Sequence, residues 1–164
     1  EQMQQRGLEP NVITFSATIQ ACGPQCSTKA AKLFQQLEAS SSIDANIVSF
    51  NAILDALYLD GVHARDILLL GVERGIYSNF VDWGPTPRLD LHNFSEGAAE
   101  TAVRWWFEEG LPSRKADATD SPCRLEIITG WGKSRPCHAE GDLLGRVKTV
   151  LDCLDVSHFH SDNP

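Results

Sequence analysis

A segment near the start of the chain occurs twice, and the two copies lie 35 residues apart. Residues 11–22 (NVITFSATIQAC) recur as residues 46–57 (NIVSFNAILDAL), with an Asn, a Phe and two Ala at matching positions. A fixed period between about 20 and 50 residues is typical of solenoids, in which each unit buries its apolar face only against its neighbours. The repeat therefore predicts an array of helical hairpins at this end of the chain.

Both copies have the i, i+3, i+4, i+7 spacing of a helix that buries one apolar face. The residues at these positions are Phe15, Thr18, Ile19 and Cys22 in the first copy and Phe50, Ile53, Leu54 and Leu57 in the second. A second helix is predicted over residues 28–39, with a less similar counterpart over 64–74. We therefore expect residues 1–80 to form about two hairpins, of which the second is degenerate.

The pattern changes after residues 83–87 (WGPTP), which break regular structure and mark a domain boundary. Beyond them, residues 88–92 and 124–129 have the composition of short strands, and residues 139–155 that of a final helix. The order strand, helix, strand, helix predicts a small α/β domain over residues 88–157, with parallel strands joined by a crossover. The fold class expected for the whole chain is α+β.

The helix between the two strands is predicted to begin at a capping box over residues 93–96 and to end at Gly110. Its apolar face consists of Ala99, Ala102, Val103 and Trp106. Because Trp106 continues this face, we expect core packing rather than a stacking platform. Residues 111–123 are polar, contain two Pro, and predict a loop.

The composition of the chain limits its function less than the repeat limits its fold. The net charge of −8 lacks the basic surplus of a non-specific nucleic-acid binder and suits a solenoid that binds a protein partner. No stretch approaches the ~20 apolar residues that cross a bilayer, so no membrane association is expected. The five Cys have irregular spacing without a C-x-x-C pair, which predicts structural thiols and no metal site. The chain lacks an initiator Met, and we expect it to be part of a longer protein.

Two sets of motifs resemble known families. The 35-residue unit, with VITFS at 12–16 and AAKLF at 30–34, resembles the pentatricopeptide repeat. The region after the boundary resembles the Smr (small MutS-related) domain through LDLH at 89–92 and TGWG at 129–132. Repeats followed by an Smr domain are similar to an arrangement found in organellar RNA-metabolism proteins. The resemblance implies single-stranded RNA as the partner, RNA processing as the role, and a chloroplast or mitochondrial location.

The repeat family reads one RNA base per hairpin, through a residue early in the first helix and the last residue of the unit. The resemblance places Ser16 with Asn46 in these roles, a pair that favours a purine, adenine in particular. In the second unit Asn51 takes the early position, but its partner would be Val81, whose side chain cannot hydrogen-bond a base. The alternative is that Asn11 and Asn46 are only helix caps.

Asp90 and His92 alternate along one predicted strand, so both fall on one face near its C-terminal end, where ligand groups gather in parallel α/β folds. A carboxylate and an imidazole can activate water or hold a divalent cation, here Mg²⁺, against a phosphodiester. One interpretation is therefore an Smr-type endonuclease. The other is that the two side chains hydrogen-bond locally and hold the turn closed in a binding module without turnover.

The Gly-rich turn after the second strand would complete this site. Gly130 and Gly132 let backbone N–H groups approach a phosphate, and Lys133 and Arg135 neutralise its charge. Trp131 is placed to stack on a base.

The same turn is not a nucleotide-binding P-loop, because position 127 holds Ile where that motif needs Gly. His158 and His160 alternate like metal ligands, but no carboxylate or Cys is patterned with them, and a disordered tail is expected. The Smr resemblance also implies one more strand after the last helix, which the sequence does not contain.

Overall fold

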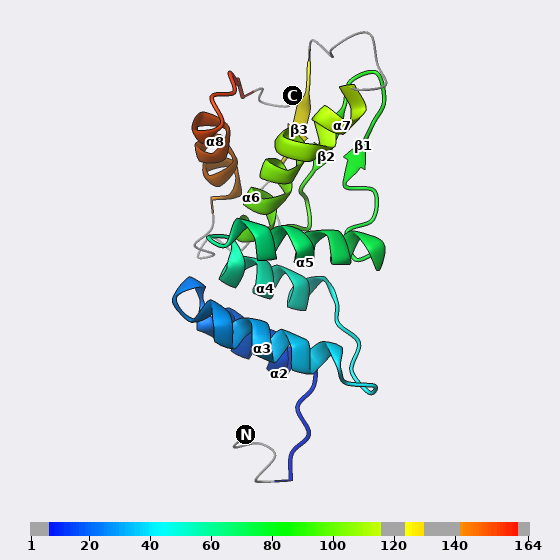
Figure 1. Ribbon diagram of the computed structural model, residues 1–164, viewed down its shortest axis with the longest axis vertical. Helices are drawn as coiled ribbons and strands as arrows, with labels where there is room; N and C mark the ends of the chain where they lie inside the picture. Colours follow the sequence, from blue (N-terminus) through cyan, green and yellow to red (C-terminus); the bar gives the residue numbers. More distant parts are fainter. Residues whose placement is uncertain (1–6, 116–123, 130–141, 161–164) are drawn as a thin grey trace. The chain divides into compact units, whose positions relative to one another are not determined.

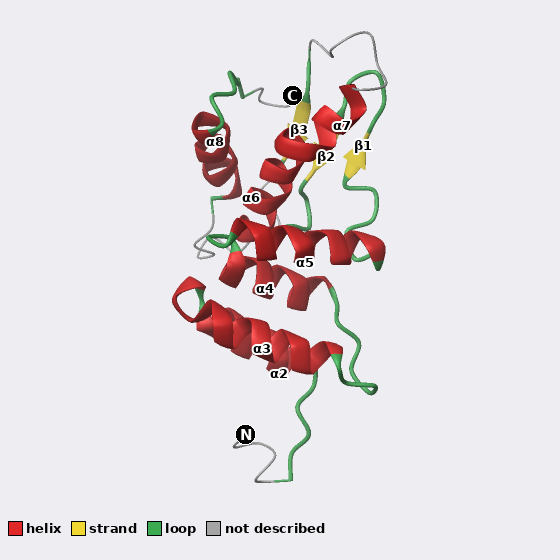
Figure 2. Ribbon diagram, in the orientation of Figure 1, coloured by secondary structure: helices red, strands yellow, loops and turns green. Residues whose placement is uncertain are grey.

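The computed structural model describes residues 7–115, 124–129 and 142–160. The chain forms two compact units, Glu1–Ser78 with Asn93–Thr101, and Asn79–His92 with Ala102–Pro164. It is mostly helical with one small sheet, as the predicted α+β class requires (Figures 1 and 2).

The first unit contains the two predicted helical hairpins. The helices are α2 (Val12–Cys22), α3 (Ser27–Glu38), α4 (Ile47–Leu57) and α5 (Gly61–Glu73), with a short 3-10 turn, η1 (Pro24–Cys26), between α2 and α3. Helix α2 packs against α3 and α4, and α4 packs in turn against α5 (Figure 1). Each hairpin thus buries its apolar face partly within itself and partly against its neighbour.

The repeated Asn residues begin the first helix of each hairpin, as predicted. Asn11 Oδ1 accepts a hydrogen bond from the backbone N of Thr14 at 3.0 Å. Asn46 Oδ1 accepts from the backbone N atoms of Val48 and Ser49 at 3.0 and 3.2 Å, and the Ser49 hydroxyl accepts from the backbone N of Asn46 at 2.9 Å. This reciprocal arrangement is a capping box, and it satisfies donors that the helix itself leaves unpaired.

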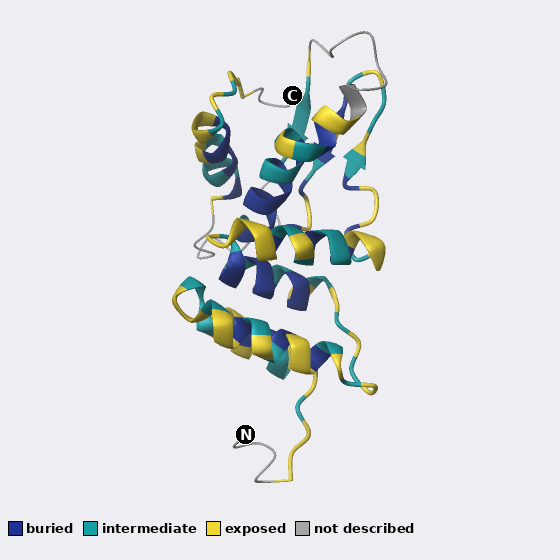
Figure 3. Cartoon of the chain, viewed as in Figure 1, coloured by how far each residue is buried: buried dark blue, intermediate teal, exposed yellow. Residues whose placement is uncertain are grey.

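The core of this unit is a series of aromatic rings. Phe34 contacts Phe50 edge-to-face at 5.1 Å, Phe50 contacts Tyr77 at 6.2 Å, and Tyr77 stacks on Phe94 at 4.6 Å. Helix α4 is buried along most of its length (Figure 3). Its predicted apolar face is confirmed, because Phe50, Ile53, Leu54 and Leu57 are all buried.

The apolar face predicted for the first copy is only partly right. Ile19 is fully buried, but Thr18 is exposed and Phe15 is only half-buried. Ser16 is buried in their place. Helix α2 has fewer packing partners than α4, so fewer of its positions are covered.

The second unit contains a three-stranded sheet in the order β1 (Val81–Asp82), β2 (Arg88–Asp90), β3 (Glu126–Ile128). Strands β2 and β3 pair in parallel, as predicted, with Asp90 beside Ile128. Strand β1 was not predicted and pairs antiparallel to β2. Two residues are too few to show an alternating pattern, so the sequence gives no signal for β1.

The helix after β2, which begins in the first unit and ends in the second, differs from expectation after Trp105. Helix α6 (Glu96–Trp105) continues into a π-helical segment, η2 (Trp106–Gly110), and then into α7 (Leu111–Lys115). The predicted loop is therefore wrong over residues 111–115, and Gly110 does not end the helix. A Cβ on Gly110 would lie 3.2 Å from atoms of Trp106 and Trp83, so the glycine makes room for two indole rings.

Two helix starts also differ from prediction. Ser95, rather than Asn93, caps α6, because its hydroxyl accepts from the backbone N of Ala98 at 3.4 Å. Helix α8 (Leu143–Cys153) begins after Asp142, whose carboxylate accepts from the backbone N of Gly145 at 2.9 Å. The apolar face predicted after residue 96 is confirmed, because Ala99, Ala102, Val103 and Trp106 are all buried.

Candidate functional site

Asn46 lies exposed at the start of α4, and capping uses only part of its side chain. The Oδ1 atom accepts the two backbone hydrogen bonds described above. Within the described part of the chain, no group accepts a hydrogen bond from the Asn46 Nδ2. A side-chain amide carries two donors on this nitrogen. Capping and base recognition are therefore compatible, and Asn46 presents hydrogen-bond donors to an incoming ligand.

Ser16, the predicted partner of Asn46, is only 5 % exposed. Its hydroxyl donates to the backbone O of Val12 at 2.8 Å, one turn earlier in α2. It would have to release this carbonyl to reach a base.

Asn51, which matches Ser16 in the second copy, is held by hydrogen bonds within its own unit. Its Nδ2 donates to the backbone O of Asn93 at 2.8 Å, and its Oδ1 accepts from the Tyr77 hydroxyl at 2.8 Å. Its predicted partner, Val81, lies in strand β1 of the second unit. Both ends of the Asn51 amide thus have intramolecular partners.

Two apolar residues that the sequence analysis did not select lie beside the capping asparagines. Ile13 is 72 % exposed and Val48 is 57 % exposed, each two residues after its Asn. They occupy the same position in the two copies. The sequence does indicate this position, because an apolar residue recurs there in both copies although the position lies outside the predicted buried face. A large exposed side chain kept apolar in both copies offers a contact surface for an apolar or planar ligand group.

Asp90 ends β2 and His92 lies in the turn after it, so the strand is shorter than the predicted 88–92, but the two side chains contact each other. The His92 Nδ1 lies 2.5 Å from Asp90 Oδ1, and the same oxygen accepts from the backbone N of His92 at 3.0 Å. Their side chains are 44 % and 49 % exposed, so solvent reaches both. Because an ionised carboxylate only accepts, the contact fixes the proton of a neutral His92 on Nδ1 and leaves Nε2 as a base.

The C-terminal ends of β2 and β3 coincide, because Asp90 pairs with Ile128 and the backbone N of Leu91 donates to the backbone O of Ile128 at 2.8 Å. The predicted turn begins two residues beyond this point of β3. Its residues Gly130, Trp131, Gly132, Lys133 and Arg135 lie outside the described residues.

The described residues contain no group of three or more His, Cys, Asp or Glu side chains arranged to hold a metal ion. At the Asp90–His92 pair, one carboxylate oxygen is already engaged by His92. Asp90 Oδ2 remains as a single oxygen ligand. Mg²⁺ is often bound by one or two carboxylates together with water and substrate phosphates, so this oxygen fits such an ion only when the substrate supplies further ligands.

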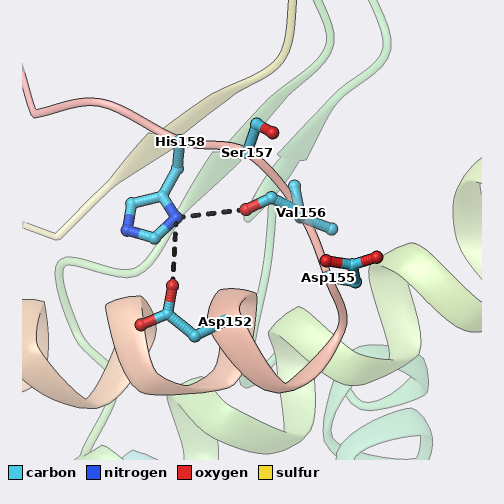
Figure 4. Close-up of a pocket in the computed structure, with 5 residues that line it drawn as sticks. All are labelled: Asp152, Asp155, Val156, Ser157 and His158. Carbon is cyan, nitrogen blue, oxygen red and sulfur yellow. Dashed lines mark hydrogen bonds and ion pairs between the residues drawn. The ribbon is translucent and has the colours of Figure 1, made fainter.

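A separate pocket of about 390 Å³ lies after α8 in the second unit. It is lined by Asp152, Asp155, Val156, Ser157 and His158 (Figure 4). His158 Nδ1 lies 3.1 Å from the backbone O of Val156 and 3.8 Å from Asp152 Oδ1. These contacts hold residues 156–158 against the end of α8. The residues that line the pocket do not converge on a common point as the ligands of a metal ion would.

Comparison with known families supports the repeat assignment at the start of the chain. Residues 1–25 match the pentatricopeptide repeat domain model. This match covers the whole of α2 and supports a pentatricopeptide-like helical repeat at this end of the chain. No curated protein matches the chain. No helix within the described ranges has the length and apolar character needed to span a membrane.

Proposed function

We propose that this protein binds single-stranded RNA through its helical repeats and acts in organellar RNA processing. The observation that carries the proposal is the Asn46 amide, which begins a repeat helix, stays exposed and keeps its Nδ2 donors available. The repeat match over residues 1–25 supports the class of ligand. The chloroplast or mitochondrial location rests on the resemblance to organellar repeat proteins with an Smr domain.

Recognition by Asn46 follows from its remaining hydrogen-bonding capacity. The Nδ2 donors pair with an acceptor on the Watson–Crick edge of a base, such as N1 of adenine. The exposed Ile13 and Val48 side chains lie one on each repeat and supply apolar contact to base faces. Ser16 contributes if its hydroxyl turns away from Val12.

The test is an RNA panel in which each position is varied through the four bases. Asn46→Ser keeps a good helix cap and the net charge but removes the amide donors. We expect discrimination at one RNA position to fall by roughly 5-fold, the value of about one hydrogen bond. Asn11→Ser is the matched control, because it makes the same change at the other capping position. Unchanged base preference in Asn46→Ser contradicts the assignment.

A second candidate function, RNA cleavage by an Smr domain, is favoured by the Asp90–His92 pair. With its proton held on Nδ1, His92 takes a proton from water through Nε2, and Asp90 stabilises the resulting imidazolium. The resulting hydroxide attacks phosphorus, the P–O bond to the leaving oxygen breaks, and that oxygen takes the proton from the His92 imidazolium. Bound Mg²⁺, held by Asp90 Oδ2 and the phosphate, would neutralise charge on that phosphate.

Asp90→Asn tests cleavage, because it keeps the shape of the side chain and removes its charge. We expect it to abolish cleavage while RNA binding stays within about 2-fold, since the pair lies apart from the repeat residues in sequence and unit. The measurement is an RNA cleavage time course with and without Mg²⁺. If wild type cleaves no faster than Asp90→Asn, the domain is a binding module without turnover.

A further inference from the structure

Helix α4 makes three hydrogen bonds to a segment 42–44 residues further along the chain. Asn51 Nδ2 donates to the backbone O of Asn93, and the Ser95 hydroxyl donates to the backbone O of Asn51 at 3.4 Å. The backbone N of Gly97 donates to Asp55 Oδ1 at 2.8 Å. All of these residues belong to the first unit, although the segment follows the sheet strand β2 in sequence.

Gly97 marks a close approach between the backbone of this segment and α4. A Cβ at this position would lie 2.7 Å from the Asp55 Cα and 2.9 Å from the Leu54 O. Both are backbone atoms, which cannot move aside as a flexible side chain can. Only glycine therefore fits, and the fit lets the Asp55 carboxylate cap the first turn of α6, where a negative charge is favourable.

Tyr77, which follows α5, packs at the same junction between α4 and residues 93–97. Gly75, with φ 72°, ends α5 and turns the chain so that the Tyr77 ring packs against Gly71. The ring stacks on Phe94, and its hydroxyl donates to Asn51 Oδ1. Burial raises the pKa of the Tyr77 phenol, and the nearby Asp55 charge adds to this, so the hydroxyl remains a donor.

We infer that residues 93–97 are the terminal cap of the helical repeats, and that Asn51 is the latch of this cap rather than a base-reading residue. A repeat array needs a different last element, because its final unit has no following repeat to cover it. The cap takes that place on α4. Asn51 has both its Oδ1 and its Nδ2 committed to the junction, unlike Asn46. The consequence for RNA recognition rests on the proposed function. In that case the last RNA base that the repeats recognise is the base bound by Asn46.

A pair of glycine substitutions tests the cap without any RNA. Alanine is the better helix former, so Gly→Ala within a helix normally stabilises. Gly61, at the start of α5, has no atom within 4 Å of its would-be Cβ and serves as the control. We expect Gly97→Ala to lower the unfolding midpoint of the helical unit by about 3–8 °C, and Gly61→Ala to leave it unchanged or higher. Equal midpoints for the two variants overturn the cap.

Far-UV circular dichroism is the appropriate signal for that comparison. Trp83, Trp105 and Trp106 belong to the second unit, and the described part of the first unit contains no Trp, so tryptophan fluorescence reports on the second unit. Loss of the cap should appear in the dichroism transition first. Asn51→Ala and Tyr77→Phe should each lower the same midpoint, and the double variant should lower it by less than their sum, because they remove one hydrogen bond from its two ends.

The RNA panel then tests whether Asn51 stabilises the cap or recognises a base. Asn51→Ala in the full chain should change affinity for every RNA of the panel by the same factor, while Asn46→Ser changes preference at one position. A change of base preference at a single position in Asn51→Ala overturns the inference. If the wild-type chain binds none of the RNAs, the proposed function fails, and the comparison of Gly97→Ala with Gly61→Ala still decides the cap.

Discussion

The two copies of the repeat share an Asn, a Phe, two Ala and an apolar pattern but have different surroundings. Phe50 is fully buried between two aromatic rings, whereas the matching Phe15 is half-buried. Asn51 is fixed by Asn93 and Tyr77, whereas the matching Ser16 bonds only its own helix among the contacts described above. The difference arises from the neighbours, because among the described elements α4 packs closely against α2, α3 and α5, whereas α2 packs closely against α3 and α4. A repeat motif therefore defines the helix, and its position in the array defines what each residue does.

The largest expected difference between the copies is the cost of losing the shared phenylalanine. Phe50→Ala should cost about 3–5 kcal/mol, since it leaves a cavity between Phe34 and Tyr77. Phe15→Ala should cost roughly 1–1.5 kcal/mol, in proportion to its smaller burial. Urea denaturation followed by far-UV circular dichroism measures both values. Similar costs would mean that the two copies are equally packed in solution.

The capping asparagines should differ less. Asn46→Ala removes one side of a reciprocal capping box and should cost about 1–2 kcal/mol, whereas Asn11→Ala removes a one-way cap and should cost about 0.5–1 kcal/mol. The same denaturation experiment compares them. A larger cost at Asn11 would contradict the capping geometry described here.

The smallest effect concerns the second helix of each copy. Asp60 caps α5 and lies 2.8 Å from His63, while α3 has no side-chain cap at its start. The hydrogen bond to Asp60 raises the pKa of His63 above 6.5, and the hydrogen bond to His63 lowers the pKa of Asp60 below 3.8. NMR titration should show the raised His63 value, and Asp60→Asn should return it to about 6.5. An unchanged titration in Asp60→Asn would contradict the pairing.

The direction of the effect on stability follows from these shifts. The raised pKa of His63 contributes stability below pH 6.5, and this is lost as the pH rises through the folded value. The lowered pKa of Asp60 contributes stability above pH 3.8, and this is lost as the pH falls through the folded value. Both contributions are present together between about pH 3.8 and 6.5. Because both side chains are exposed, solvent screens the pair and the contribution is small.

The helices and the parallel strand pair could be predicted from the sequence because their signals are local. Asn46 before an apolar run predicts both the cap and the buried face of α4. Asp90 and His92 meet because a carboxylate at the end of a strand can accept from the backbone N two residues on, in the turn that follows. Local patterns of this kind need no knowledge of distant contacts.

The remaining features depend on distant contacts and had no local signal. Asn51 matches a base-reading position in sequence, and only its contacts with Asn93 and Tyr77 show how its amide is used. Gly110 follows an apolar helix pattern and so resembles a helix end, but a glycine is needed there because the Trp83 and Trp106 rings pack against it. The cap at residues 93–97 joins parts of the chain that the predicted boundary at 83–87 separates.

The central claim is that the repeats bind single-stranded RNA, and the salt dependence of binding tests it most directly. Fluorescence anisotropy with a labelled single-stranded RNA would be measured over a series of NaCl concentrations. Each phosphate that the bound RNA places against a cationic side chain adds about −0.7 to the slope of log K against log salt, so we expect a clearly negative slope. A flat dependence, or no binding at low salt, would contradict the account and favour a helical repeat that binds a protein partner, in keeping with the net charge of −8.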